Sequence, residues 1–197
     1  MTFEILSALM LFAFVSSITP GPNNLMLMAS GANYGVKRTL PHMLGVASGF
    51  TLMVVLVGLG IMQLFDAFPI TYTVLKVLSV TYLLYLAYKI ATSSKAAQGK
   101  SATAKPMTFL QAVMFQWVNP KAWTMALTAF SVYAPSKSVA AVVMVAGVFG
   151  AVNLPCISGW TVLGQKIQSF LTNNNRLRVF NFTMAGLLVT SLYPIFL

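Results

Sequence analysis

The sequence predicts an all-α integral membrane protein with six transmembrane helices arranged as two inverted three-helix repeats. Of its residues, 58% are hydrophobic and 7% are charged, against about 25% charged residues in a typical soluble domain. Six apolar stretches are each long enough for a helix of about 20 residues, which crosses about 30 Å of hydrocarbon. Prolines interrupt the first and the fourth of these stretches. Little of the chain is left for a separate soluble domain.

The predicted spans follow one another through short polar connections. The first should be an uncleaved span, because it lacks the basic segment and small-residue cleavage site of a signal peptide. A basic loop over Gly31–Pro41 precedes the second span, and the polar stretch Gln165–Leu177 precedes the last. Thr92–Pro106, rich in Ser, Ala, Gly and Lys, should be a flexible linker. The six spans are predicted at residues 5–29, 42–65, 69–91, 107–134, 138–164 and 178–197.

This linker divides the chain into two halves with matching features. Residues 1–91 form the first predicted three-helix repeat and residues 107–197 the second, with 92–106 as a cytoplasmic linker. Three spans per half insert the second half upside down relative to the first. Pro20 and Pro120 break the first helix of each half, 100 residues apart. Paired broken helices in inverted repeats are the best sequence indication of a transporter's central site.

The basic residues predict the orientation in a bacterial inner membrane. The chain carries 12 Lys and Arg against 2 acidic residues, a net charge of +10. Lys and Arg collect in cytoplasmic loops, so this charge favours a membrane topology over a nucleic-acid partner. Both termini are predicted outside, because that topology puts nine of the basic residues inside. The nine are Lys37, Arg38, Lys89, Lys95, Lys100, Lys105, Lys166, Arg176 and Arg178.

One basic residue, Lys121, falls within the fourth predicted span. A lone lysine inside a membrane costs several kcal/mol unless it faces a protein interior or a water-filled cavity. It follows directly after the break at Asn119 and Pro120. Irregular backbone at this depth is tolerated only where protein buries it or where it lines a cavity. We therefore expect Lys121 to be functional.

Several motifs resemble those of the lysine exporter (LysE/RhtB) superfamily of amino acid efflux proteins. They are Thr19-Pro20-Gly21-Pro22-Asn23, the glycines Gly31, Gly35, Gly45 and Gly49, the Leu75–Leu86 stretch, Asn119-Pro120-Lys121-Ala122 and the Trp160–Gly164 segment. The likeness covers essentially the whole chain. Within the superfamily, Pro22-Asn23-Asn24 and Phe115–Asn119 look most like the cysteine and O-acetylserine exporter branch. One departure is Phe50, where many members carry an acidic residue.

This resemblance implies export of small neutral amino acids or derivatives, either cysteine- and O-acetylserine-like or homoserine- and threonine-like, by alternating access. Such a zwitterion needs partners for a carboxylate and an ammonium group. Lys121 and the backbone N–H groups after Pro22 suit the carboxylate. Freed carbonyls, asparagine amides, or the faces of Trp117 and Trp123 suit the ammonium. The candidate substrate-binding residues are Pro20, Gly21, Pro22, Asn23, Asn24, Gln116, Asn119, Pro120, Lys121 and Asn153.

Other readings remain open at this stage. The main alternative function is a membrane channel or a non-transport membrane subunit. An enzyme is disfavoured, because the interior offers no carboxylate pair, Ser-His-Asp set or metal-ligand cluster, and no cofactor or metal is expected. Energy coupling is either proton exchange through Lys121 or facilitated export, and His42, at a predicted helix end, is either structural or a proton relay. The Gly45–Gly49 spacing suits packing within one subunit or a homodimer.

Overall fold

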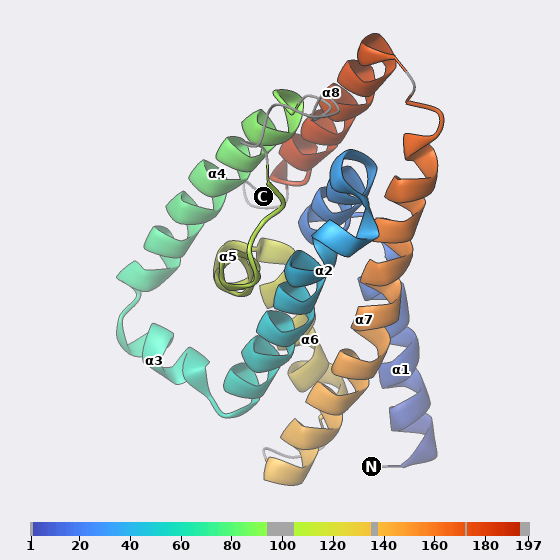
Figure 1. The fold of residues 1–197 in the computed structure, drawn as a ribbon. Coiled ribbons are helices and arrows are strands. Elements are labelled where there is room, and N and C mark those ends of the chain that lie inside the picture. The colour runs from blue at the N-terminus through green and yellow to red at the C-terminus, as the bar shows by residue number, and fades with distance from the viewer. Residues whose placement is uncertain (1, 94–104, 135–137, 172, 194–197) are drawn as a thin grey trace.

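A computed structural model describes residues 2–93, 105–134, 138–171 and 173–193, and every element in these ranges is helical. Figure 1 shows the helices as one bundle. Three of them, α2, α4 and α7, are long and apolar enough to cross a membrane, and two shorter apolar helical segments accompany them. In chain order the elements are α1 (Phe3–Ile18), α2 (Pro22–Gly58), α3 (Ile61–Ala67), α4 (Ile70–Ala91), α5 (Phe109–Phe115), the 3₁₀ helix η1 (Gln116–Val118), α6 (Pro120–Tyr133), α7 (Val139–Gln168) and α8 (Asn174–Thr190).

Both predicted breaks are present. The first predicted span divides at Thr19–Gly21 into α1 and the start of α2. The fourth divides at Asn119 into α5 with η1 and then α6. In each case proline occupies the first position of the new helix, where its fixed φ and missing N–H are tolerated.

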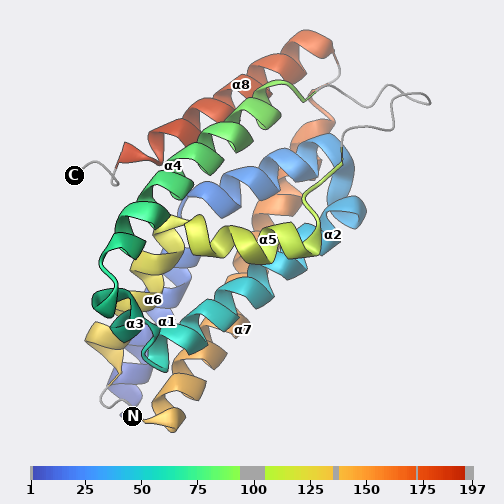
Figure 2. The same ribbon diagram turned by 90° about the vertical axis from the view of Figure 1, so that its left-hand side faces the viewer.

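The prediction of a loop over Gly31–Pro41 is wrong. The chain reverses at one residue, Gly35, between two helical segments of α2 (Figure 2). Gly35 has φ 77° and ψ 165°, in the positive-φ region that residues with a side chain rarely adopt. Thr39 donates to its carbonyl at 2.9 Å. Gln165 accepts from the N–H of Val36 at 2.6 Å. These bonds fix the reversal without a loop.

The last two helices also differ from their predicted bounds. α7 continues to Gln168 and α8 already begins at Asn174, so most of the polar stretch Gln165–Leu177 is helical. Asn173 caps α8 by accepting from the N–H of Arg176 at 2.8 Å, which lets a polar sequence start a helix. Most of the predicted linker, residues 94–104, lies outside the described residues.

The two predicted halves contact each other extensively through α2 with α7 and through α4 with α8. Glycines permit the closest approach between α2 and α7. A Cβ on Gly164 would lie 2.0 Å from the carbonyl oxygen of Met28, and one on Gly31 would lie 2.2 Å from that of Thr161. Small residues at such crossings let helix backbones approach closely in membrane proteins. A buried cluster around Phe149 joins α1, α2, α6 and α7.

The two ends of the bundle differ in charge. The reversal in α2, the end of α4, the end of α7 and the start of α8 lie at one end (Figures 1 and 2), and these segments carry Lys37, Arg38, Lys89, Lys166 and Arg176. The start of α1, α3 and the start of α7 lie at the other end. We call the first of these the basic end.

Candidate functional site

The first helix break is an extended segment between two helix ends. α1 ends at Ile18, Thr19 and Gly21 are extended, and α2 starts at Pro22. The end of a helix leaves carbonyl groups without helical partners, and the start of a helix leaves N–H groups without them. Inside a membrane these groups need partners from the protein or from a ligand. The break therefore places acceptors and donors side by side.

Side chains from other elements take the freed carbonyls of α1. Asn24 donates its amide to the carbonyl oxygens of Ser17 at 2.8 Å and Thr19 at 2.7 Å. From α7, Trp160 donates to the carbonyl oxygen of Ile18 at 3.0 Å. The C-terminal end of α1 is thus held by residues of α2 and α7.

Lys121 completes this set from the second break. Its Nζ donates to the carbonyl oxygen and the hydroxyl of Thr19 at 2.8 and 3.0 Å and to the carbonyl oxygen of Pro20 at 3.3 Å. A cation is favoured at the C-terminal end of a helix by the helix dipole. Gly21 leaves room for the lysine, because a Cβ there would lie 2.6 Å from Lys121 Cδ. Lys121, the lone lysine of the fourth predicted span, is therefore hydrogen-bonded to the first break.

The second break is closed mainly by its own residues. Asn119 caps α6 by accepting from the N–H of Lys121 at 3.2 Å. Gln116 donates to the carbonyl oxygen of Ala112 at 2.9 Å, one turn earlier. Trp123 donates to the carbonyl oxygen of Trp117 at 2.9 Å. These two rings, one of the alternatives considered for the ammonium group, pack against each other and do not line the cavity described below.

An amide pair links the two breaks. Asn23 donates to Gln116 Oε1 at 2.8 Å, and Gln116 donates back to Asn23 Oδ1 at 3.2 Å. Gln116 is fully buried. Two reciprocal bonds fix the relative position of the break in α1–α2 and the break before α6.

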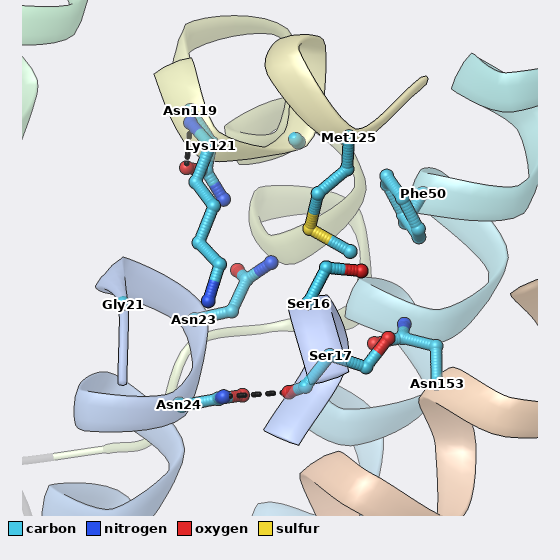
Figure 3. A pocket seen from close by; sticks show the side chains of 11 residues that line it. Ser16, Ser17, Gly21, Asn23, Asn24, Phe50, Asn119, Lys121, Met125 and Asn153 are labelled. Carbon is cyan, nitrogen blue, oxygen red and sulfur yellow. Dashed lines mark hydrogen bonds between the residues drawn. The ribbon is translucent and has the colours of Figure 1, made fainter. Parts of the chain in front are cut away.

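A small central cavity of about 20 Å³ lies where the breaks meet (Figure 3). By this measure a water molecule needs about 10–15 Å³. Six of the ten predicted site residues line it: Gly21, Asn23, Asn24, Asn119, Lys121 and Asn153. The other four do not line it. Pro20, Pro22 and Pro120 lie at the breaks, and Gln116 is hydrogen-bonded to Asn23.

Sequence reasoning missed several lining residues, including Ser17, Phe50 and Met125. A serine within one turn of a helix break was an available signal for Ser17. Phe50 packs edge-on against Phe149, with ring centroids 5.4 Å apart. An aromatic ring therefore occupies the cavity wall at the position where the resemblance would allow an acid.

Three sets of polar groups at the cavity have donors or acceptors without a hydrogen-bonding partner in the described chain. Ser17 Oγ is buried without a partner. The amide of Asn153, a residue 6% exposed, has no hydrogen-bonding partner among the described residues. The start of α2 has no side-chain cap, which leaves the N–H groups of Asn23 and Asn24 at the positive end of a helix dipole. These groups suit a small ligand with an anionic end.

His42 is not at a helix end as predicted. It lies inside α2 after the reversal, is 1% exposed, and neither ring nitrogen has a hydrogen-bonding partner in the described chain. It does not line the central cavity.

A family comparison decides the class of protein. The model of the LysE type translocator family matches residues 14–192. The chain belongs to this family. Cysteine/O-acetylserine efflux proteins of Escherichia coli K12 and Shigella sonnei are each 30% identical to it, over the full length of both chains. No solved structure matches the chain. This translocator is therefore a membrane transporter rather than an enzyme.

Proposed function

We propose that this translocator exports small neutral amino acids or close derivatives across a bacterial inner membrane. The observation that carries the proposal is the meeting of two helix breaks at one polar cavity. Full-length relatives named as cysteine/O-acetylserine efflux proteins support the substrate class. Zwitterionic substrates of this kind include cysteine, O-acetylserine, homoserine and threonine.

The substrate carboxylate is assigned to the start of α2. The N–H groups of Asn23 and Asn24 lack a side-chain cap, and the charge of Lys121 lies at the same cavity. Helix N-termini bind anions through both their free N–H groups and the dipole. Asn153 and Ser17 supply further polar contacts. No Asp or Glu is among the described lining residues, so a substrate with a second ammonium group finds no counter-ion.

Alternating access between two inverted repeats is the proposed mechanism. The elements that would correspond in the two halves, α2 with α7 and α4 with α8, pack against each other. Broken helices at Pro20 and Pro120 begin the halves 1–91 and 107–197. The central cavity holds space for about one water, so an amino acid requires the halves to move apart.

Counterflow in proteoliposomes tests the function. Liposomes loaded with unlabelled O-acetylserine should accumulate radiolabelled cysteine and O-acetylserine saturably, whereas lysine should neither enter nor compete. Saturable lysine counterflow would contradict the site assignment. Ion conductance without counterflow would instead indicate a channel.

The orientation is proposed with the basic end in the cytoplasm and both termini outside, as the distribution of Lys and Arg favours. Single cysteines at Ser169, near the α7–α8 connection, and at Gln63, in α3, would lie at opposite ends. Both positions are exposed. In a Cys156→Ala background, an impermeant thiol reagent applied to cells should label only the cysteine at 63. Labelling of only the cysteine at 169 would reverse the orientation.

For energy coupling we propose proton exchange through Lys121. The lysine would be charged while the carrier holds the substrate carboxylate and would exchange its proton as the empty carrier returns. Arginine stays charged in proteins, so Lys121→Arg should keep counterflow but lose uphill transport driven by a pH gradient. A wild-type protein that a pH gradient cannot drive uphill would indicate facilitated export.

A further inference from the structure

A second cavity, of about 70 Å³, lies between the reversal of α2, the end of α4 and the segment before α5. It shares no lining residue with the central cavity. The first half of α2 runs from one to the other, because Asn24 lines the central cavity and Tyr34 lines the second. Ten residues of helix correspond to about 15 Å. The second cavity therefore lies on the path from the basic end to the central site.

A buried histidine forms part of its wall. His42 is the single histidine of the chain, it is 1% exposed, and both ring nitrogens lack a hydrogen-bonding partner in the described chain. Buried polar groups are nearly always hydrogen-bonded, and exceptions call for a specific explanation. A neutral imidazole offers one donor and one acceptor nitrogen. His42 lines the cavity, so a ligand that displaces the groups covering its ring nitrogens would satisfy the group that the fold leaves without a partner.

Two lysines provide positive charge at the same cavity. Lys89 near the end of α4 and Lys105 before α5 both line it and are exposed, and Lys89 lies 5.7 Å from the centre of the Tyr85 ring. Tyr34 adds a hydroxyl from α2. No acidic side chain is among the described lining residues, so the carboxylate of a ligand would meet no repulsion.

Hydrogen bonds fix the wall behind these groups. Asn33, which lines the cavity, donates to Asn181 Oδ1 at 3.0 Å. Asn181 in turn donates to the carbonyl oxygen of Ser93 at 2.7 Å. The network joins α2, α8 and the end of α4. It gives the cavity a defined shape while leaving His42 and the two lysines outside the network.

We propose that this cavity is a second binding site, which takes the zwitterionic substrate at the basic end before it reaches the central cavity. Lys89 and Lys105 bind the carboxylate, the acceptor nitrogen of His42 accepts from the ammonium, and the apolar wall around Leu86 contacts the substrate side chain. A lipid phosphate would accept from the two lysines and from the donor nitrogen of His42, but it offers no donor to the acceptor nitrogen. The inference rests on the proposed function, because the substrate class comes from it.

The single histidine makes the site directly observable. With a histidine-free affinity tag and ¹⁵N-labelled histidine, the protein in lipid nanodiscs has one imidazole NMR signal pair. O-acetylserine should shift this signal saturably. A Lys89→Gln/Lys105→Gln variant should bind about tenfold more weakly or worse, as expected for lost charge-assisted hydrogen bonds. The matched control Lys37→Gln/Lys166→Gln removes two charges of the same end that do not line the cavity, and it should bind like wild type.

Three outcomes would overturn the second site. The signal could fail to shift, it could shift with inorganic phosphate but not with O-acetylserine, or its shift could be lost in Lys121→Met and kept in Lys89→Gln/Lys105→Gln. Counterflow separates this failure from failure of the proposed function. Counterflow without a change in the His42 signal would disprove the second site and leave the transport function standing. If the His42 signal responds to O-acetylserine in a way that depends on Lys89 and Lys105, but counterflow is absent, the transport function is disproved and the binding site stands.

Discussion

The two helix breaks look alike in sequence but are held together in opposite ways. At the first break, the carbonyls of four consecutive residues, 17 to 20, accept hydrogen bonds from Asn24, Trp160 and Lys121, which lie in three different helices. At the second break, Asn119, Gln116 and Trp123 bond to backbone groups two to six residues away.

This difference separates a dependent break from a self-contained one. Movement of the second half would release the carbonyls of Ile18 and Pro20 from Trp160 and Lys121. Asn24 would still hold those of Ser17 and Thr19 from within α2. The second break keeps its local backbone bonds wherever it moves, and only the amide pair of Gln116 and Asn23 would be released. Substitutions at partners of the first break should therefore impair transport and the association of the halves, whereas those at the second should have local effects.

Lys121→Met should have the largest effect, because this residue joins the breaks. It removes the charge at the central cavity and the three hydrogen bonds to Thr19 and Pro20. Counterflow should fall to the rate of empty liposomes. The lost bonds should also lower the free energy of unfolding by about 1–3 kcal/mol, measured by denaturation in detergent.

Lys121→Arg is the matched variant, since it keeps the charge and the donors. It should retain counterflow and most of the stability. Wild-type counterflow in Lys121→Met would show that the lysine has no role in the substrate site.

Gly21→Ala tests whether the position of Lys121 matters, without changing the lysine. The new Cβ would lie 2.6 Å from Lys121 Cδ and 3.1 Å from Nζ, which forces the side chain away from Thr19. Alanine tolerates the extended backbone of this residue, with φ −179° and ψ 177°. Counterflow should fall about tenfold, which corresponds to about 1.4 kcal/mol, and the thermal midpoint should fall because the bonds to Thr19 are lost.

Gly159→Ala is the control, because a Cβ built there has no described atom within 4 Å apart from the nearby backbone of its own helix and its chain neighbours. It should transport like wild type. Equal transport by Gly21→Ala and Gly159→Ala would show that the bonds between Lys121 and the first break are dispensable.

The breaks themselves could be predicted because prolines in apolar stretches are visible in the sequence. The family followed from the same motifs. The partners of the first break could not be predicted, since carbonyls of residues 17 to 20 leave no side-chain signal and their donors come from up to 142 residues away. Phe50 and Met125 line the cavity only because of helix packing, which no spacing along the chain reveals.

The errors around the second span have a common cause. Polar residues next to glycines look like a loop, yet Gly35 alone supplies the turn and the residues on both sides remain helical. The second span therefore starts earlier than predicted. As a result His42 moves from a predicted helix end into the buried interior.

Asn24→Ala should have the third-largest effect, and that effect should be mainly on stability. Its amide bonds two carbonyls of the first break, and alanine would leave both without this donor. Unsatisfied buried groups cost about 1–3 kcal/mol, so the thermal midpoint should fall clearly. Asn24→Gln keeps the amide on a longer side chain and should recover part of the loss. A wild-type midpoint for Asn24→Ala would show that the first break does not depend on this residue.

Asn119→Ala should have the smallest effect, if the second break is self-contained. The substitution removes the cap of α6, a bond to the N–H of Lys121, and loss of such a cap costs about 1 kcal/mol. Asn119→Ser keeps a capping oxygen and should restore most of that stability. Because the bonds of Gln116 and Trp123 remain, counterflow should fall less than in Gly21→Ala. If Asn119→Ala instead destabilises the protein more than Asn24→Ala does, the contrast between the two breaks fails.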